Sequence, residues 1–197
     1  MSTQKKGSIA FAVCGSFCTL DAALHAAEAL AAQGWELWPI MSFAAQQDTR
    51  FGTGKFWRDR LAALAGRPVL DTLQAVEPLG PKHMAQALVI APCTGATLAR
   101  LAAGLSDTPV TLAAKSLLRV GCPVVISVST NDGLGASGEN IARLYQRKRF
   151  YFVPYGQDDP AGKPNSLKAD LAQLPAALDA ALQHRQLQPV LLGQNRS

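Results

Sequence analysis

The chain is poor in the residues that mark several common classes of protein. Only 17% of its 197 residues are charged and 7% are aromatic, while 48% are hydrophobic, which is the composition of a folded domain and not of a disordered chain. No hydrophobic run is long enough to span a bilayer. The apolar stretch that follows Lys5 is interrupted by polar residues between Gly15 and Asp21, which argues against a signal peptide. We therefore expect a soluble, cytoplasmic protein.

The few cysteines and histidines do not form a recognisable pattern. The cysteines have neither the C-x-x-C spacing of a zinc site nor the arrangement of a secreted disulfide framework; they are Cys14, Cys18, Cys93 and Cys122. The three histidines lie far apart, at positions 25, 83 and 184. Spacing alone therefore predicts no metal site and no Ser-His-Asp arrangement.

The net charge of +5 comes from basic residues that are spread along the chain. The densest run, from Arg143 to Arg149, stands at the end of a predicted helix, where cations are stabilised by the helix dipole. This distribution argues against a nucleic-acid surface. A positive balance fits a small anionic substrate equally well.

Apolar runs that alternate with helical periodicity predict an α/β fold with a doubly wound parallel sheet of about five or six strands. Strands are expected at 9–14, 35–41, 87–90, 122–128 and 150–153, with a brief one at 68–70. Helices are expected between them, and a last amphipathic helix is expected to carry Leu167, Leu171, Leu174, Leu178 and Leu182. We expect a single domain over 1–197, with an N-terminal extension at 1–6, a mobile loop at 42–55 and a C-terminal tail at 186–197.

The most informative segment, 91–97, reads Ala-Pro-Cys-Thr-Gly-Ala-Thr and follows a buried strand. It places Thr94, Gly95 and Thr97 at a helix N-terminus, where free backbone N–H groups favour an anion. The same hydroxyls could instead serve only as helix caps. The sequence of this segment leaves both interpretations open, an anion site and a simple helix cap.

Other polar turns follow strands and should meet this segment at one edge of the sheet. Gly15 and Ser16 follow the first strand, but the further glycines of a G-x-G-x-x-G fingerprint are missing, which argues against a Rossmann dinucleotide site. Ser42 closes the second strand. The turn 129–133 (Ser-Thr-Asn-Asp-Gly) could surround a ring system or simply cap the next helix. The segment 151–166 combines three prolines, two carboxylates and aromatic residues, and we expect a loop of fixed shape over the sheet edge or a neighbouring subunit.

Several motifs together resemble the homo-oligomeric flavin-containing cysteine decarboxylase superfamily, and most closely its branch of dipicolinate synthase B subunits. The motifs are Asp-Thr-Arg-Phe-Gly at 48–52, Glu-Pro-Leu-Gly-Pro-Lys at 77–82, Ile-Ala-Pro-Cys-Thr-Gly at 90–95, Ser-Thr-Asn-Asp at 129–132, Tyr-Phe-Val-Pro-Tyr-Gly-Gln-Asp-Asp-Pro at 151–160 and Lys-Pro-Asn-Ser-Leu at 163–167. The resemblance implies a three-layer, Rossmann-like flavodoxin sandwich that forms homo-oligomers and binds FMN, often between subunits.

Carried onto this chain, the resemblance assigns the cofactor to the turns after the strands. The implied FMN-binding residues are Gly15, Ser16, Phe17, Ser42, Pro92, Cys93, Thr94, Gly95, Ala96, Thr97, Ser129 and Thr130. Relatives usually have Asn where this chain has Ala96, which removes one side-chain hydrogen bond worth about 0.5–1.5 kcal/mol. The chain also lacks the early catalytic histidine and the Pro-x-Met-Asn strand end of the decarboxylases, so peptidyl-cysteine decarboxylation is not expected.

The branch implies oxidation of a dihydrodipicolinate-type precursor to pyridine-2,6-dicarboxylate, in the mother cell of a sporulating bacterium and together with the A subunit of the same synthase. Arg50 is the first candidate anchor for a dicarboxylate, followed by Lys163 and Lys115. Asn131 and Asp132 could orient the ring or accept a proton. The alternatives are a non-catalytic chain that binds flavin or product and completes a site on the A subunit, and an FMN-dependent decarboxylase or flavin prenyltransferase relative.

Overall fold

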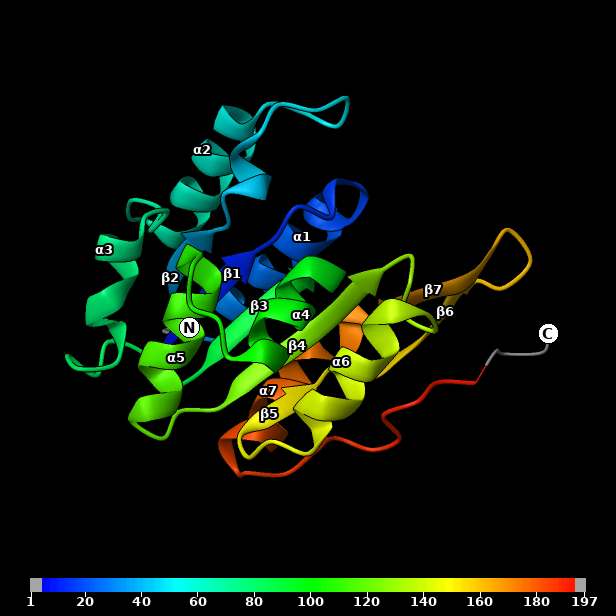
Figure 1. The fold of residues 1–197 in the computed structure, drawn as a ribbon. Helices are drawn as coiled ribbons and strands as arrows, with labels where there is room; N and C mark the ends of the chain where they lie inside the picture. The colour runs from blue at the N-terminus through cyan, green and yellow to red at the C-terminus, as the bar shows by residue number, and fades with distance from the viewer. Residues whose placement is uncertain (1–4, 194–197) are drawn as a thin grey trace.

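A sheet with helices on both faces forms the centre of the computed structural model, which describes residues 5–193 (Figure 1). Five strands run parallel: β1 (Gly7–Val13), β2 (Trp35–Met41), β3 (Leu88–Cys93), β4 (Val124–Thr130) and β5 (Phe150–Phe152). They are ordered β2-β1-β3-β4, with β5 beside the first half of β4. The expected doubly wound sheet is confirmed. Residues 1–4 of the expected extension and 194–197 of the expected tail lie outside the described residues.

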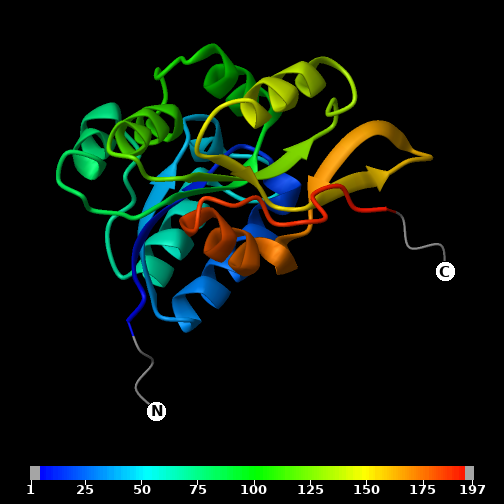
Figure 2. The ribbon, with the colours of Figure 1, turned by 90° about the horizontal axis from the view of Figure 1, so that it is seen from below.

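Two layers of helices cover the sheet, as the view from below shows (Figure 2). One layer contains α1 (Leu20–Ala32), α2 (Gly54–Ala65) and α7 (Leu174–Leu182), and the other contains α3 (Leu73–Val76), α4 (Gly95–Ala103), α5 (Pro109–Arg119) and α6 (Ala136–Tyr145). Short 3-10 turns lie at η1 (Phe17–Thr19), η2 (Ala44–Gln46), η3 (Glu77–Leu79) and η4 (Leu171–Gln173). Among the residues that the structure describes, no helix has both the length and the apolar character needed to cross a membrane.

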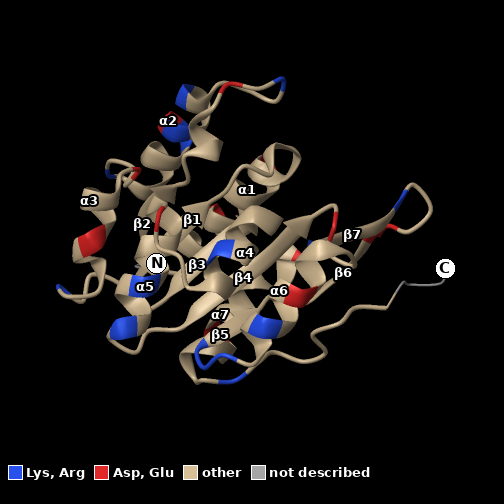
Figure 3. Cartoon of the chain, viewed as in Figure 1, with Lys and Arg blue, Asp and Glu red and all other residues tan. Residues whose placement is uncertain are grey.

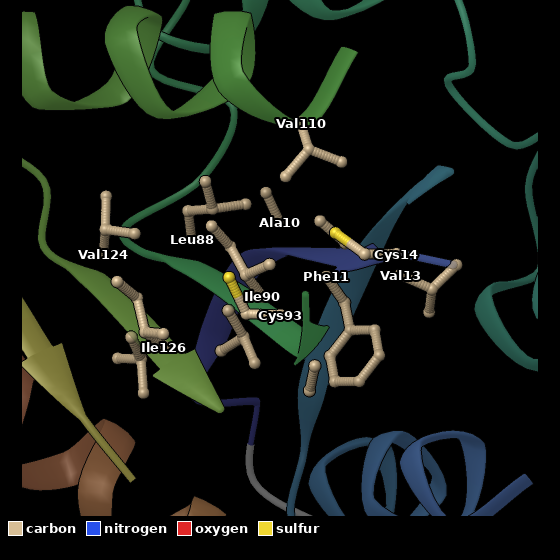
Figure 4. Packing of buried hydrophobic residues seen from close by; sticks show 14 of the residues in the cluster. Ala10, Phe11, Val13, Cys14, Leu88, Ile90, Cys93, Val110, Val124 and Ile126 are labelled. Carbon is tan, nitrogen blue, oxygen red and sulfur yellow. The ribbon is translucent and has the colours of Figure 1, made fainter. Parts of the chain in front are cut away.

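The core lies between these layers because the central strands are apolar on both faces. All six residues of β3 are buried, as are the first five of β4, which is typical of strands inside a parallel sheet. Figure 4 shows Phe11, Ile90 and Ile126 from three neighbouring strands, with Val110 of α5 above the sheet. β2 lies at the edge of the sheet, the position in which its Pro39 is tolerated.

The expected loop at 151–166 is wrong, because most of it forms an antiparallel hairpin. β6 (Tyr155–Asp159) pairs with β7 (Lys163–Ala169), and β7 pairs with the end of β4 through Ser129 and Thr130. The sheet therefore has seven strands, in place of the expected five or six. The prolines fall in the turn or near strand ends, and the exposed polar residues belong to an edge strand, so the segment has the composition of a loop.

Two other boundaries differ from the sequence expectation. The last helix starts at Leu174, because Leu167 belongs to β7 and Leu171 begins η4. The expected strand at 68–70 is reduced to one bridge between Leu70 and Ile40. The described part of the tail is held in place: Gln186 bonds the backbone of Phe152 at 2.8 and 2.7 Å, and residues 190–192 pair with Tyr155.

Candidate functional site

A polar cavity of about 430 Å³ lies where β1, β3 and β4 end, between the turns that follow these strands and the β6–β7 hairpin. The carboxyl edge of a parallel sheet is the common place for ligands in this type of fold. The cavity is lined by Gly15, Ser16, Cys18, Thr19, Thr94, Gly95, Ser129, Thr130, Asn131, Asp158, Lys163, Ser166, Leu167 and Lys168.

Hydroxyl groups from two distant turns meet on one wall of this cavity. The Oγ atoms of Ser16 and Ser129 are 2.9 Å apart, and Thr19 Oγ1 lies 3.3 Å from Ser129 Oγ. Thr19 Oγ1 also donates to the carbonyl oxygen of Ser16 at 2.8 Å. These contacts fix the turn after β1 against the end of β4. They leave a set of small groups that can both donate and accept hydrogen bonds toward a ligand.

The N-terminus of α4 forms a second wall. Thr94 is the N-cap, and its side-chain oxygen accepts from the backbone N–H of Thr97 at 3.4 Å. The first N–H groups of a helix have no partner within the helix, so those at Gly95 and Ala96 can bind an anion. The side chain of Thr97 is buried, and its hydroxyl donates to the sulfur of Cys14 at 3.3 Å. Thr97 therefore supports the turn from inside, whereas Thr94 and Gly95 line the cavity.

Asp132 joins the end of β4 to the start of α6. Its Oδ1 accepts a hydrogen bond from Ser137 Oγ at 2.8 Å and another from Thr130 Oγ1. These two bonds lower the pKa of the Asp132 carboxyl below its ordinary value. A carboxylate held in this state is a poor proton acceptor. Gly95 lies against the same three groups, since a Cβ added to it would be 2.5 Å from Ser137 Oγ, 2.9 Å from Thr130 Oγ1 and 3.0 Å from Asp132 Oδ1.

The charged residues of the cavity come from the hairpin. Asp158 Oδ1 lies 3.7 Å from Lys168 Nζ, and Asp158 Oδ2 lies 3.7 Å from Lys163 Nζ. Figure 3 shows acidic and basic colours side by side on β6 and β7. Two ammonium groups share one carboxylate, so this side of the cavity carries a net positive charge.

Cys18 is exposed, whereas the other three cysteines are buried or partly buried. Burial raises the pKa of Cys14 to about 11 and that of Cys93 well above its usual value, and it also raises the pKa of Cys122. Cys18 is exposed and lines the cavity. Among residues 5–193, no group of three or more histidines, cysteines and carboxylates is placed to hold a metal ion.

A second cavity, of about 470 Å³, lies on the other side of the hairpin, between α6 and the segment 191–192. It is mainly apolar, and no charged side chain among the described residues lines it. Its polar groups include the hydroxyls of Tyr145 and Tyr155, 3.3 Å apart, whose pKa values are raised by burial. The polar cavity is the better candidate because it brings together several turns that the sequence singled out.

The structure brings only part of the sequence-predicted set to the cavity. Gly15, Ser16, Thr94, Gly95, Ser129, Thr130, Asn131 and Lys163 line it, while Phe17, Ser42, Pro92, Cys93, Ala96, Thr97, Asp132, Arg50 and Lys115 do not. Pro92 and Cys93 are buried at the end of β3. Ser42 is buried, and its Oγ accepts from the N–H of Ala45 at 3.2 Å.

The two other candidate cations lie elsewhere. Arg50 is exposed in the loop between β2 and α2, with its guanidinium 4.8 Å from the ring of Phe51, and Lys115 lies on α5. In contrast, sequence reasoning missed six residues that line the cavity: Cys18, Thr19, Asp158, Ser166, Leu167 and Lys168. Thr19 could have been found, because it stands three residues after the Gly-Ser turn. Lys168 could not, because the leucine spacing around it predicts the start of a helix.

The donor set of the cavity fits a phosphate monoester attached to a polyhydroxyl chain. The helix N-terminus at Thr94 supplies N–H donors for the phosphate. The hydroxyls of Ser16, Thr19 and Ser129 can bond a chain of hydroxyl groups. Leu167 is the one large apolar side chain among the residues that line the cavity.

Comparison with known proteins gives three similarities. Residues 1–153 match the model of the family described as Flavoprotein. The chain is 42% identical over 193 residues to the B subunit of dipicolinate synthase from Bacillus subtilis (strain 168), covering 98% of this chain and 96% of the relative. The crystal structure of the dipicolinate synthase B subunit from Bacillus halodurans C superposes with a TM-score of 0.88 at 39% identity, over 98% of this chain and all of that one.

A more distant structure shares the fold alone. The FMN-dependent cysteine decarboxylase SpaF has a TM-score of 0.66 at 24% identity, covering 91% of this chain and 97% of that one.

Proposed function

Because the chain belongs to the Flavoprotein family, within the branch of dipicolinate synthase B subunits, we propose that it is the flavin-binding subunit of a dipicolinate synthase. Its reaction would be the oxidation of a dihydrodipicolinate-type precursor to pyridine-2,6-dicarboxylate, with the A subunit of the synthase as partner. The observation that carries this proposal is the cavity at the strand ends, which joins an anion-binding helix N-terminus, a wall of hydroxyls and a cationic hairpin.

FMN is the flavin that the donor set fits. Thr94 and Gly95 would hold the phosphate, and Ser16, Thr19 and Ser129 would hold the ribityl chain. When bound, FMN supplies a two-electron acceptor for a hydride taken from the dihydropyridine ring. The name of SpaF, an FMN-dependent enzyme of the same fold, agrees with this choice of cofactor.

The remaining tasks fall to side chains around the cavity. Asn131 lies at the end of β4, where its Oδ1 is 3.5 Å from the hydroxyl of Ser166, and its amide can hydrogen-bond a carboxylate or a ring nitrogen. Asp132 keeps this turn in place through Thr130 and Ser137. Its lowered pKa makes it a positioning residue rather than a base, and we do not assign it proton transfer.

A second candidate function is a binding chain that does no turnover alone and completes a site on the A subunit. The lining of the cavity favours this alternative, because Leu167 is the one large apolar side chain among its lining residues and a flat ring needs further apolar contacts. A second copy of the chain would supply such contacts equally well. The names of two relatives of the same fold describe a dodecamer and a cubic cage, which agrees with assembly into a homo-oligomer.

Anaerobic mixing with the dihydropyridine precursor separates the two candidates. The purified chain should take up FMN, and the substrate should bleach the flavin absorbance near 450 nm, roughly the visible band of an oxidised flavin. A chain that remains colourless after FMN addition would refute flavin binding. Bleaching by this chain alone supports the oxidoreductase, whereas bleaching only after the A subunit is added supports the binding chain.

A further inference from the structure

We propose that Asp158, Lys163 and Lys168 form a clamp that binds both carboxylates of a planar dianion, which we call the dianion clamp. Each lysine takes one carboxylate of the ligand, and Asp158 holds the two ammonium groups when the ligand is absent. The identity of the dianion as pyridine-2,6-dicarboxylate or its dihydro precursor rests on the proposed function. The clamp itself rests on the geometry of the hairpin.

Strand register directs Lys168 toward the cavity. Lys168 of β7 stands directly opposite Ser129 of β4, and directly opposite residues of antiparallel strands point to the same face. Ser129 points into the cavity, because its Oγ lies 2.9 Å from that of Ser16. Side chains alternate along a strand, so Ser166 shares this face, and it lines the cavity too. On its other cross-strand side, Lys168 faces Gly156, which has no side chain to crowd it.

Alternation along β6 directs Asp158 toward the same place. Gly156 stands opposite Lys168, and Asp158 lies two residues further along β6, so it shares the face of Lys168. The register then shifts between Gln157 and Asp159, where Asp158 alone spans the stretch that residues 164–166 occupy on β7. Asp158 is the most buried of the three clamp side chains, at 30% exposure, and each of its oxygens faces a different lysine.

The ion pairs within the clamp are loose, so a ligand can replace them. Both N–O distances are 3.7 Å, longer than a direct hydrogen bond. The lysines are about half exposed, and ion pairs of that kind contribute little to folding stability. Structural ion pairs would be closer and better covered. The geometry instead leaves two cations free to form shorter bonds with an incoming anion.

The chemistry of the clamp favours two carboxylates on one molecule. In pyridine-2,6-dicarboxylate both carboxylates flank the ring nitrogen, so they lie on one edge of the ring. Each can bond one ammonium group, while the hydroxyls and Asn131 of the cavity remain neutral partners. A ligand with one carboxylate would engage one lysine only and leave the other with Asp158. The clamp therefore predicts discrimination between a dianion and the corresponding monoanion.

The test is a calorimetric titration of the full chain with pyridine-2,6-dicarboxylate and with pyridine-2-carboxylate, with and without saturating FMN. Lys163→Gln and Lys168→Gln should each weaken the binding of the dicarboxylate about tenfold and change that of the monocarboxylate less. Lys115→Gln, on α5 and away from the cavity, removes the same charge and should change neither. Asp158→Asn should tighten the binding of the dicarboxylate, because no internal carboxylate then competes for the lysines.

Each outcome bears on the clamp alone. Equal affinity of the wild type and both lysine variants for the dicarboxylate would overturn it, as would no measurable binding by the wild type. Tighter binding of the dicarboxylate by Asp158→Asn supports the clamp even if a lysine variant is unstable, because a misfolded chain would bind the ligand less tightly and not more. If the wild type takes up no FMN while the lysines still control dicarboxylate binding, the flavin function fails and the clamp stands.

Discussion

Replacing Gly95 by alanine is the sharpest test of the candidate anion site. The added Cβ would lie 2.5 Å from Ser137 Oγ, 2.9 Å from Thr130 Oγ1 and 3.0 Å from Asp132 Oδ1. The closest of these separations is about 1 Å shorter than an ordinary van der Waals contact. The hydroxyl of Ser137 must therefore move, and its hydrogen bond to Asp132 is lost.

The expected cost follows from the bond that breaks. A hydrogen bond to a charged group contributes about 1.5–3 kcal/mol, and the better helix propensity of alanine offsets up to about 1 kcal/mol of the loss. We expect Gly95→Ala to lower the free energy of unfolding by about 1–2 kcal/mol, or Tm by about 2–8 °C in a chain of this length. Because the hydroxyls of Ser137 and Thr130 must rearrange beside the N-terminus of α4, FMN affinity should fall about tenfold or more.

Gly104, at the other end of α4, provides the matched control. Its φ of 74° is unfavourable for alanine, but no atom lies within 4 Å of the added Cβ. Gly104→Ala should cost about 1–2 kcal/mol of stability through backbone strain and leave FMN affinity unchanged. Thermal unfolding and quenching of FMN fluorescence measure the two effects separately. An equal loss of FMN affinity in both variants, or none in Gly95→Ala, would refute the placement of the phosphate.

Three further predictions concern residues near this helix. Ala96→Asn should leave FMN affinity nearly unchanged, because the side chain at position 96 does not line the cavity, and severalfold tighter binding in a fluorescence titration would show that the phosphate lies elsewhere. The pKa of Asp132 is lowered in the folded chain, so the carboxylate stabilises the fold above the unfolded pKa of about 4, and this stabilisation is lost as the pH falls through the folded pKa. The difference in unfolding free energy between the wild type and Asp132→Asn should therefore narrow as the pH falls through that range, and a difference that widens there would contradict this prediction. Iodoacetamide at pH 7.5 should label the exposed Cys18 before the buried Cys14, whose pKa of about 11 keeps it protonated, and FMN should slow the labelling of Cys18. A peptide map in which Cys14 is labelled first would count against this geometry.

The parallel part of the fold could be predicted because its signals are local. Continuous apolar runs gave β1, β2 and β3 to within a few residues, and β2 has the bounds expected from its sequence. Gly66 and Gly104 end their helices in the left-handed conformation, at the places where the sequence has its helix stop signals. Such features depend on a few neighbouring residues and not on distant pairing.

The hairpin could not be predicted in this way. β7 alternates buried and exposed residues only near its end, and its pairing with β4 involves residues almost forty positions apart. Leu167 stands at helical spacing from Leu171 and Leu174, so periodicity alone placed it on a helix. The same error hid Lys168. A helical Lys168 would have no fixed relation to Ser129, whereas the strand register places them opposite each other.

The two halves of the cavity therefore differ in origin and in the property that they control. The turns after β1, β3 and β4 provide neutral donors, and their positions are fixed by the buried parallel strands that precede them. The hairpin provides the charged side chains, and in the sheet it pairs with β4 at two positions, Ser129 with Lys168 and Thr130 with Leu167. Substitutions on the hairpin can thus alter the charge of the ligand that binds without disturbing the helix N-terminus of α4. Cofactor affinity should follow changes at Gly95, and preference between dianion and monoanion should follow changes at Lys163 and Lys168.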